Sequence, residues 1–488
     1  MHVNVVIAGA GPAGLACARQ LQRERPELEV LVLEAGRPYR RRPCPVDRGR
    51  ACTGCAGICN VVSGFGGSMH WGDGVKLSLL PSGRRLVPHL GEAEALRLCQ
   101  EAFGWLTSHL HRAPALLGQD LSQRAVDAFA RHQLQIREYP VAVLGESDLR
   151  AVIENTYDQL SATVRIWHTS ELLDAVPDGQ GLKLSVSTSE GERPVSADHL
   201  VLATGRRGVT STAALLRRLG VPMSLPDISV GVRFEMAAPL LETIGDEHPD
   251  LKISQNDAVV EQKTKTFCFC GGGNGGRVKF THYQGAFGEP VITLDGHETT
   301  ERPISGRELA ANFGLLCQVQ DRGDANQARA SFLAAYRALN NSHPFAQTLR
   351  AFLDRSGDEA SWAELELALP FQPSILDLSV GRVDRLFTDA EHASLKAGFG
   401  RVMGSILGHR GGPDLGALLD EVLVIGPELE FLWERPEIDA SGKVPGLPVY
   451  VAGDAAGIAQ GVVQAAMMGF AAGKGITQRI PIREGVGA

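Results

Sequence analysis

A glycine-rich turn between an apolar strand and a helix opens the chain. Residues 3–8 are apolar and rich in β-branched side chains, which is typical of a strand buried on both faces of a parallel sheet. Residues 9–14 read Gly-Ala-Gly-Pro-Ala-Gly, a complete G-x-G-x-x-G, and helix-forming residues follow over 15–25. A second apolar strand, 30–33, ends in Glu34, 20 residues beyond the last glycine. Strand, glycines, helix, strand and acid in this order predict a dinucleotide-binding site.

Each residue of this turn has a physical reason to be there. Gly9 permits the tight turn, Gly11 lets the backbone approach a pyrophosphate, and Gly14 lets the helix pack closely on the strand. The helix N-terminus offers free N–H groups to the phosphates, and we include Ala13 at this end in the site. The carboxylate of Glu34 can accept hydrogen bonds from a ribose 2′-hydroxyl, and its charge disfavours a 2′-phosphate.

Two later segments decide between the possible dinucleotides. Residues 199–205 read as a strand that ends in Ala-Thr-Gly, and residues 446–457 as a strand that ends in Gly-Asp, with a helical segment over 461–473. Together with the G-x-G-x-x-G at 9–14, these two segments resemble the motifs of the two-dinucleotide-binding-domain flavoproteins, in the same order. In that family the Asp of the Gly-Asp pair holds the flavin ribityl chain. The resemblance implies FAD rather than NAD. The implied site residues are Thr204, Gly205, Gly453, Asp454 and Gly461.

A second G-x-G-x-x-G stands at residues 271–276. The residues after it, 277–283, alternate between polar and apolar like a strand and do not start a helix. Because the dinucleotide fingerprint needs a helix at this point, we predict that this match is a false positive. The sequence therefore predicts no separate NAD(P) domain.

Cysteines and glycines between residues 44 and 76 resemble a narrower family. The chain reads Cys-Pro at 44–45, Cys-Thr-Gly-Cys at 52–55, Gly-Phe-Gly-Gly-Ser at 64–68 and Gly-Asp-Gly-Val-Lys at 72–76. This pattern is similar to that of an uncharacterised bacterial group of predicted FAD-dependent dehydrogenases with a Cys-Pro…Cys-x-x-Cys…Gly-x-Gly-Gly…Asp-Gly-Lys signature. Later segments at 230–235 and 266–270 agree with it, whereas the lysine stands one residue later than in the group. The glycine loop adds Gly66, Gly67 and Ser68 to the predicted FAD site.

Four clustered cysteines form a candidate metal site. Cys44, Cys52, Cys55 and Cys59 fall within 16 residues. Four thiolates at this density can wrap a zinc ion or an iron–sulfur cluster, and they can equally stay reduced thiols without a metal, because the spacing is not diagnostic. Cys268 and Cys270 are two residues apart, which predicts side chains on the same face of a strand.

Three residues are candidates for the chemistry itself. His70 can move a substrate proton beside a flavin, and Trp71 next to it is expected to reach the flavin ring. Lys76 can place a positive charge near the flavin ring and stabilise its reduced form. Arg435 can hold an anionic substrate group with two hydrogen bonds. Histidine, lysine and arginine also occur at solvated or packing positions.

The fold class expected from these marks is α/β. A Rossmann-like FAD-binding domain is joined to a mixed or antiparallel β-sheet substrate domain, as in the two-dinucleotide-binding-domain flavoproteins, because period-2 alternation dominates residues 227–300. We expect the FAD-binding domain to come from three separated pieces. The predicted boundaries are 1–84 with the cysteine-rich loop, 85–190 as a mixed α/β insertion, 191–225, 226–440 as the substrate domain, and 441–488.

Charge and hydropathy exclude other classes of function. The net charge is −8, and the longest basic run has three arginines, at residues 40–42, which argues against nucleic-acid binding. No stretch of about 18 apolar residues is present, so no membrane span is expected. Nine cysteines without the basic start of a signal peptide predict a reducing compartment, the cytoplasm.

The sequence therefore predicts an FAD-dependent oxidoreductase, a dehydrogenase or reductase that transfers hydride between a small organic substrate and flavin N5. Two alternatives remain open at this point. One is an electron-transfer flavoprotein, with an iron–sulfur cluster at the four cysteines and a ferredoxin-like partner. The other is an FAD-dependent monooxygenase that uses oxygen.

Overall fold

The first strands of the chain build a mixed sheet, here called the first sheet. The structure is a computed structural model that describes residues 1–48, 50–70, 72, 74–226, 228–257, 262–283, 291–299, 306–357, 360–412, 414–430 and 434–480. Within these residues the strand order is β6-β2-β1-β9-β8-β7, and β21 also pairs with β9. Its strands are β1 (His2–Ala8), β2 (Val30–Glu34), β6 (Arg165–His168), β7 (Glu171–Asp178), β8 (Gly181–Thr188), β9 (Gly191–Leu202) and β21 (Val449–Val451).

The first sheet changes direction along β9. Strands β6, β2, β1, β9 and β21 run parallel to one another, whereas β8 runs antiparallel to both β9 and β7. One side of β9 pairs with β1, and its other side pairs with β8 in its first half and with β21 at its end. The glycine turn, the end of β9 and the end of β21 therefore meet at one edge of the sheet, where the carboxyl ends of its parallel strands lie.

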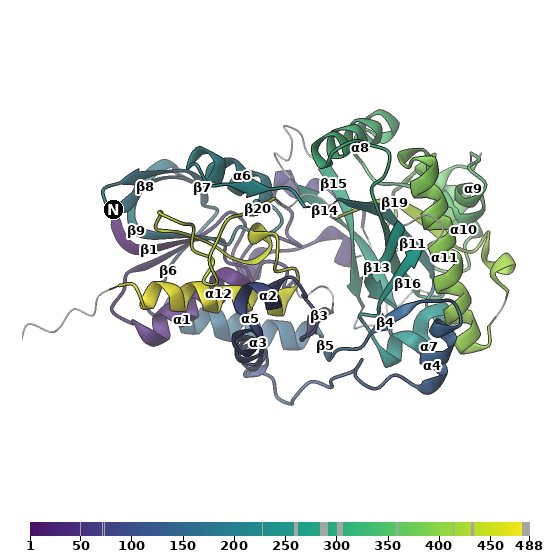
Figure 1. The fold of residues 1–488 in the computed structure, drawn as a ribbon, viewed down its shortest axis with the longest axis horizontal. Coiled ribbons are helices and arrows are strands. Elements are labelled where there is room, and N and C mark those ends of the chain that lie inside the picture. Colours follow the sequence, from purple (N-terminus) through teal and green to yellow (C-terminus); the bar gives the residue numbers. More distant parts are fainter. Residues whose placement is uncertain are drawn as a thin grey trace, which may run out of the picture.

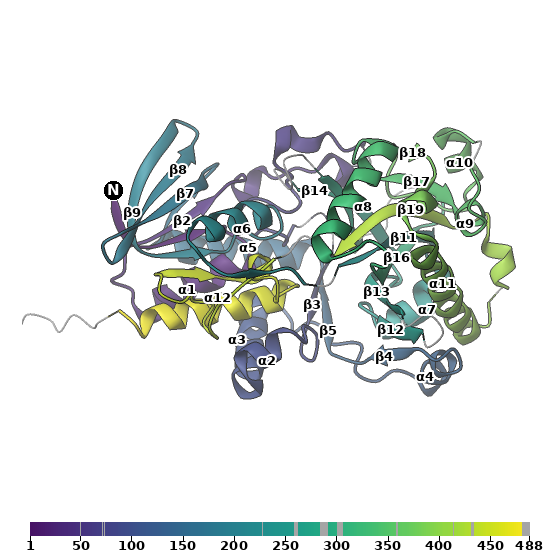
Figure 2. The same ribbon diagram turned by 45° about the horizontal axis from the view of Figure 1, so that its top comes forward.

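Two helices far apart in the sequence pack against each other beside the first sheet. These are α1 (Pro12–Glu24) and α12 (Val462–Thr477), which lie side by side in Figures 1 and 2. A Cβ on Gly469 would overlap the carbonyl oxygen of Ala13, so the close approach of the helices requires glycine there. The helices α2 (Leu86–Leu90), α3 (Glu92–Thr107), α5 (Glu146–Ser161) and α6 (Val209–Arg218) belong to the same half of the molecule.

The second sheet lies beside the first along the long axis of the molecule (Figure 1). Its order in the described residues is β18-β17-β19-β11-β16-β13-β12-β4, and its pairs are antiparallel except for β17 with β18. Its strands are β4 (Gln135–Arg137), β11 (Ser229–Ala237), β12 (Lys252–Asp257), β13 (Gln262–Cys270), β16 (Ala310–Gln318), β17 (Phe345–Thr348), β18 (Ser379–Val380) and β19 (Leu423–Glu430).

Helices and hairpins complete the second half. The longest helix, α11 (Asp389–Arg410), packs on β16 and β13, and its buried residues join the core that β11 and β16 also face. The other helices here are α4 (Gln123–Ala130), α7 (Pro239–Glu247), α8 (Ala325–Asn340), α9 (Leu349–Leu353) and α10 (Trp362–Ala368). Three short pairs stand apart from the large sheets: β3 (Val75–Ser78) with β5 (Val141–Leu144), β10 (Met223–Ser224) with β20 (Arg435–Pro436), and β14 (Gly276–Tyr283) with β15 (Val291–Glu298).

This architecture confirms the predicted fold class, an α/β chain with a Rossmann-like sheet and a largely antiparallel second sheet. Residues 165–188 supply β6, β7 and β8 to the first sheet, and the domain boundaries themselves stay a prediction. Residues 276–283 after the second G-x-G-x-x-G form strand β14, as predicted. In the regions that the structure covers, no helix has the length and apolar character that a membrane crossing needs.

Candidate active site

A cavity of about 790 Å³ lies between the two sheets. This volume is typical of sites for small molecules and cofactors. One part of its wall comes from the edge of the first sheet, where the glycine turn and the ends of β9 and β21 meet. The other part comes from β3, β4, β12, β13 and β15, which belong to or lie beside the second sheet.

The glycine turn forms one end of this cavity. Gly9 has a φ of +112°, and a Cβ there would overlap the carbonyl oxygen of Ala203, so the position requires glycine. Gly11 is the N-cap of α1, whose first turn carries no acidic side chain. The free N–H groups at this helix end and its positive dipole suit a bound phosphate. The turn is thus a backbone-lined cradle next to a helix N-terminus, which fits a pyrophosphate.

Residues 64–68 close over the turn. The N–H of Gly66 donates to the carbonyl oxygen of Ala10 over 2.8 Å, and a Cβ on Gly67 would lie 2.7 Å from the Cα of Gly11. Arg42, almost fully buried, holds this loop, since its guanidinium donates to the carbonyl oxygens of Phe65 (2.8 Å) and Gly67 (2.5 Å). The burial of Arg42 is not evident from the sequence, because its place in a run of three arginines suggests an exposed residue.

Glu34 joins three loops at the cavity wall. Its carboxylate accepts hydrogen bonds from the backbone N–H groups of Ala10 (2.9 Å), Gly36 (2.7 Å) and Gly64 (2.8 Å). The side chain is buried and lines the cavity. Besides the ribose contact that the sequence predicts, Glu34 therefore fixes the loops that would surround the nucleotide.

The C-terminal segment brings Asp454 and the start of α12 to the cavity. Asp454 follows β21, and Arg206 Nε lies 3.4 Å from its Oδ2. Burial raises the pKa of Asp454, and Arg206 opposes this shift. Arg206 Nη1 also donates to Asp295 Oδ2 over 2.5 Å, so one arginine links the edge of the first sheet to β15. Arg206 stands directly after the Ala-Thr-Gly segment, but nothing in the sequence signals its two acidic partners.

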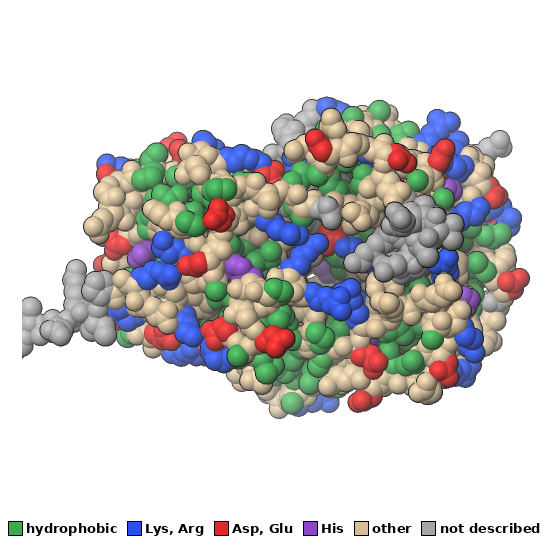
Figure 3. Space-filling view, in the orientation of Figure 1, with side chains coloured by type: hydrophobic (Ala, Val, Ile, Leu, Met, Phe, Trp, Pro, Cys, Tyr) green, Lys and Arg blue, Asp and Glu red, His purple; other side chains and the backbone are tan. Residues whose placement is uncertain are grey.

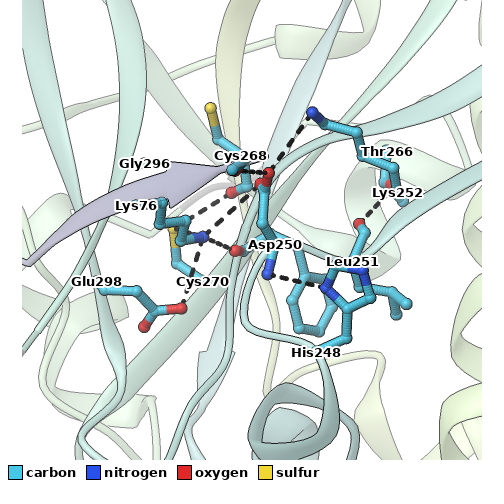
Figure 4. Close-up of polar contacts among 12 residues, drawn as sticks. Lys76, His248, Asp250, Leu251, Lys252, Thr266, Cys268, Cys270, Gly296 and Glu298 are labelled. Atoms are coloured by element: carbon cyan, nitrogen blue, oxygen red, sulfur yellow. Dashed lines mark hydrogen bonds and ion pairs between the residues drawn. The ribbon is translucent and has the colours of Figure 1, made fainter. Parts of the chain in front are cut away.

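Lys76 lines the cavity, and Figure 4 shows its side chain between Cys270, Asp250 and Glu298. Its ammonium donates to the carbonyl oxygen of Phe269 and to Cys270 Sγ (3.4 Å), and it lies 3.5 Å from Glu298 Oε1 and 4.0 Å from Asp250 Oδ1. Burial disfavours its charge, but Cys270, Glu298 and Asp250 outweigh that effect and raise its pKa. Lys76 is therefore a fixed positive charge inside the cavity.

Asp250 is the hydrogen-bonded acid of this wall. Its Oδ2 accepts from the hydroxyls of Ser78 and Tyr139, each over 2.8 Å. Burial would raise its pKa, but Lys252, Lys76 and these hydroxyls lower it to about 2. Asp250 thus stays ionised at every working pH.

Glu298 differs from Asp250 in its ionisation. Burial raises the pKa of Glu298 to about 7, and Lys76 opposes this shift. The side chain is 4% exposed and lines the cavity. A carboxyl that titrates near neutral pH inside a cavity is suited to accept or donate a proton. Neither Asp250 nor Glu298 carries a signal in the sequence, since isolated acids at strand ends are commonly solvated.

Strand β13 does not keep the regular alternation expected at its cysteines. The pairing of β13 with β16 shifts between Phe267 and Cys270, and Cys268 has a φ of +43°. The expectation that Cys268 and Cys270 share a face is therefore wrong, because this bulge turns one relative to the other. Cys268 lines the cavity, whereas the Cys270 thiol meets Lys76 (Figure 4).

The cavity gathers most of the predicted cofactor residues. Its wall includes Gly9, Gly11, Ala13, Glu34, Gly67, Ser68, Thr204, Gly205, Gly453, Asp454 and Gly461. Gly14 and Gly66 are outside the wall. A Cβ on Gly14 would overlap the carbonyl oxygen of Gly9, which fits the close helix packing expected of it.

The three predicted catalytic residues are separated. Lys76 lines the cavity, but His70 and Arg435 do not. His70 is buried, with Nε2 3.0 Å from Asp47 Oδ2, and Arg435 lies on β20. Trp71 falls outside the described residues.

The four clustered cysteines surround a second, very small pocket of about 10 Å³, together with Lys279 and His282 of β14. Cys52 Sγ lies 3.5 Å from His282 Nε2. Burial raises the pKa of Cys44 to about 11 and also raises the pKa values of Cys52 and Cys59. Among the residues whose positions are described, no three His, Cys, Asp or Glu side chains are grouped so that they could hold a metal ion. A zinc ion or iron–sulfur cluster at Cys44, Cys52, Cys55 and Cys59 is therefore not supported.

The chain shows only limited sequence similarity to known proteins. No family model matches the chain. A mercuric reductase of Streptomyces lividans is 40% identical over 77 residues, which are 16% of this chain and 15% of that protein.

Solved structures match along nearly the whole chain. Pyridoxine 4-oxidase from Mesorbium loti is 14% identical, with a TM-score of 0.46 over 98% of this chain and 99% of its own. The anhydrotetracycline hydroxylase OxyS from Streptomyces rimosus is 14% identical, with a TM-score of 0.38 over 99% of this chain and 64% of its own. A flavoprotein/dehydrogenase from Cytophaga hutchinsonii is 12% identical, with a TM-score of 0.35 over 98% of this chain and 78% of its own. Likenesses of this size say nothing of the substrate of the present chain.

Proposed function

We propose that the chain is an FAD-dependent oxidoreductase that transfers hydride between a small organic substrate and flavin N5. The observation that carries this proposal is a single cavity whose two ends differ in chemistry. One end is a glycine cradle beside two helix N-termini, those of α1 and α12, and the other end is a polar wall on the second sheet.

The cradle residues would hold the cofactor along its length. Gly9 and Gly11 with the α1 N-terminus suit the pyrophosphate, Glu34 the adenosine ribose, and Asp454 the ribityl chain. The N-terminus of α12 at Gly461 carries no acidic side chain in its first turn, so it suits a partial negative charge on the flavin ring. When bound, FAD supplies a carrier that accepts or donates a hydride.

The opposite wall supplies proton chemistry and a fixed charge. Glu298 would take a proton from, or return it to, a substrate hydroxyl or amine as the hydride moves. Lys76 holds a positive charge 3.5 Å from that carboxyl, which favours its ionised form and orients it. Of the three catalytic residues predicted from the sequence, Lys76 is the one that its position in the cavity supports.

Flavin analysis tests this function directly. Purified protein should be yellow and should release about one FAD per chain on heating. The variant Asp454→Ala should retain much less FAD than wild type, whereas Asp178→Ala, on an exposed hairpin, should retain the wild-type amount. A colourless wild-type protein with no releasable flavin would refute the proposal.

Further measurements on the same protein test the two alternatives, an electron-transfer flavoprotein and a monooxygenase. Iron and inorganic sulfide in the anaerobically purified protein, with a signal in electron paramagnetic resonance after reduction, would favour electron transfer to a ferredoxin-like partner. Substrate-dependent oxygen consumption that requires NADPH would favour a monooxygenase, and turnover under nitrogen would exclude it. Turnover under nitrogen with an artificial electron acceptor is the outcome that the dehydrogenase proposal expects.

A further inference from the structure

We infer that the substrate carries an anionic group, a carboxylate or a phosphate, which Arg84, Arg85 and Arg137 bind at the cavity wall. This inference rests on the proposed function and names the class of substrate for the same cavity. All three arginines line the cavity, and they come from two different segments of the chain. On the face of the molecule drawn in Figure 3, Lys and Arg side chains surround a hollow near the middle.

Arg84 and Arg85 belong to a segment that is held against the first turn of α12. Gln464, in the first turn of α12, donates through Nε2 to the carbonyl oxygens of Ser78 (2.9 Å) and Ser82 (3.3 Å). Gly83 packs against the same Gln464 side chain, so the segment that carries Arg84 and Arg85 is fixed beside this helix. An anion bound here would lie near the proposed place of the flavin ring rather than that of the pyrophosphate.

The other cations on this side of the cavity already have acidic partners. Lys76 pairs with Glu298, Lys252 lies 3.5 Å from Asp250 Oδ2, and Lys265 pairs with Glu430. Lys252 also lies 4.9 Å from the centre of the Tyr139 ring, a cation–π contact. These lysines are therefore engaged by the protein itself.

Arg84, Arg85 and Arg137 differ from these lysines. In the described structure, none of their guanidinium groups has an ion pair or a hydrogen bond with a side chain or a carbonyl oxygen. Glu138, on the same wall, is the one nearby cavity-lining acid for which the described residues likewise show no ion pair, so three unpaired cations face one unpaired carboxylate. This surplus of positive charge at the wall of a cavity attracts an anion.

The charged form of Arg137 is disfavoured because no counter-charge lies beside it in the described structure. Burial lowers its pKa, and the positive charge of Arg84 lowers it further. Two guanidinium groups close enough to disfavour each other are stabilised when an anion lies between them. The planar guanidinium matches a carboxylate or a phosphate with two parallel hydrogen bonds, which a lysine cannot offer. Because both arginines line the cavity and the charge of Arg84 acts on Arg137, an oxyanion shared by the two would relieve their repulsion.

Direct binding measurements test the inference without knowledge of the substrate. Calorimetric titration of the purified wild-type protein would use acetate, benzoate, citrate, inorganic phosphate and phenyl phosphate, with benzamide as the uncharged counterpart of benzoate. At least one anion should bind, benzamide should not bind comparably, and added salt should weaken the binding. Comparing the affinities of the carboxylates with those of the phosphates shows which of the two anionic groups the arginines bind.

The variants Arg84→Gln and Arg137→Gln should each weaken the binding of that anion by about tenfold or more. Arg193→Gln, an arginine on the exposed β8–β9 hairpin, should bind like wild type. Equal binding by all three variants, or no anion that binds to wild type, would overturn the inference. Because FAD content is measured on each preparation, loss of anion binding at full FAD content is distinguished from failure of the proposed function.

Discussion

At Glu298, burial and a neighbouring lysine act in opposite directions on one carboxyl group. Because burial raises its folded-state pKa to about 7, above that of an unfolded glutamate, the folded protein binds this proton more tightly. The resulting stabilisation is complete below the unfolded pKa and is lost as the pH rises through about 7.

We predict that Glu298→Gln removes this part of the pH dependence. The free energy of unfolding of wild type relative to the variant should fall between pH 5 and pH 8, as measured by urea denaturation at each pH. Glu190→Gln, which changes an exposed glutamate of the β8–β9 hairpin, should leave the wild-type pH dependence unchanged. A constant difference between wild type and Glu298→Gln over this range would show that Glu298 does not titrate there.

Single residues differ in how far the sequence can predict them. Gly9, Glu34 and Asp454 stand at fixed distances from strand and helix signals, so local pattern suffices to predict that they lie together. Asp250 and Glu298 carry no such signal. Their burial and their proximity to Lys76 depend on packing between segments more than 150 residues apart.

At the scale of elements, the contact between α1 and α12 depends on one glycine. A Cβ on Gly469 would overlap the backbone oxygen of Ala13, and backbone cannot move aside easily. We predict that Gly469→Ala lowers the free energy of unfolding by about 1–3 kcal/mol and weakens FAD retention, because it displaces the start of α12. Thermal unfolding and released flavin measure the two effects.

Gly400 of α11 is the matched control, since no atom lies within 4 Å of the place of an added Cβ. Gly400→Ala should leave stability unchanged or raise it by up to about 1 kcal/mol, as expected for alanine in a helix. Equal effects of the two substitutions would contradict the close-packing argument for Gly469.

Strands β11 and β19 are joined by a buried ion pair. Arg233 Nε and Nη2 donate to Glu428 Oε2 over 2.9 and 2.7 Å, and Arg233 Nη1 donates to the carbonyl oxygen of Cys268 (3.1 Å). We predict that Arg233→Met costs about 3–5 kcal/mol, because it leaves Glu428 buried without a counter-charge. Urea denaturation measures the loss.

The double variant Arg233→Met with Glu428→Leu should recover most of that stability, since it removes both charges together. A double variant as unstable as the single one would show that the Arg233 contact to Cys268, rather than the ion pair, stabilises the sheet.

Whole elements were predictable where their local signals agree. Helix α8 begins with a capping box of Asp324 and Gln327, a start signal that stands in the local sequence itself. The bulge in β13 was not predictable, because its sequence still alternates while its backbone does not. Pairing with β16 decides that geometry, and a single strand carries no information about its partner.

At the scale of the whole molecule, the sequence predicts one wall of the cavity better than the other. The glycine marks define the edge of the first sheet, since each mark is local. The second wall assembles from β3, β4, β12, β13 and β15, whose contacts with one another are long-range. For the same reason, the sequence did not indicate that His70 and Arg435 lie away from the cavity while Lys76 lines it.

Arg206 and Asp295 join the two halves of the molecule across 89 residues of sequence. Asp295 is buried, and burial would raise its pKa. Arg206 and His297 lower the pKa of Asp295 instead, so the ion pair is present at neutral pH. We predict that Asp295→Asn lowers the free energy of unfolding by about 2 kcal/mol, the usual value of a hydrogen bond to a charged group. In the variant, Asp454 remains as a carboxylate near Arg206, so the FAD content should change less than in Asp454→Ala. Differential scanning calorimetry and flavin release measure both effects, with Asp178→Asn on the exposed hairpin as the control. If Asp295→Asn were as stable as this control, other contacts would hold the two halves together, and the cavity would not depend on this ion pair for its shape.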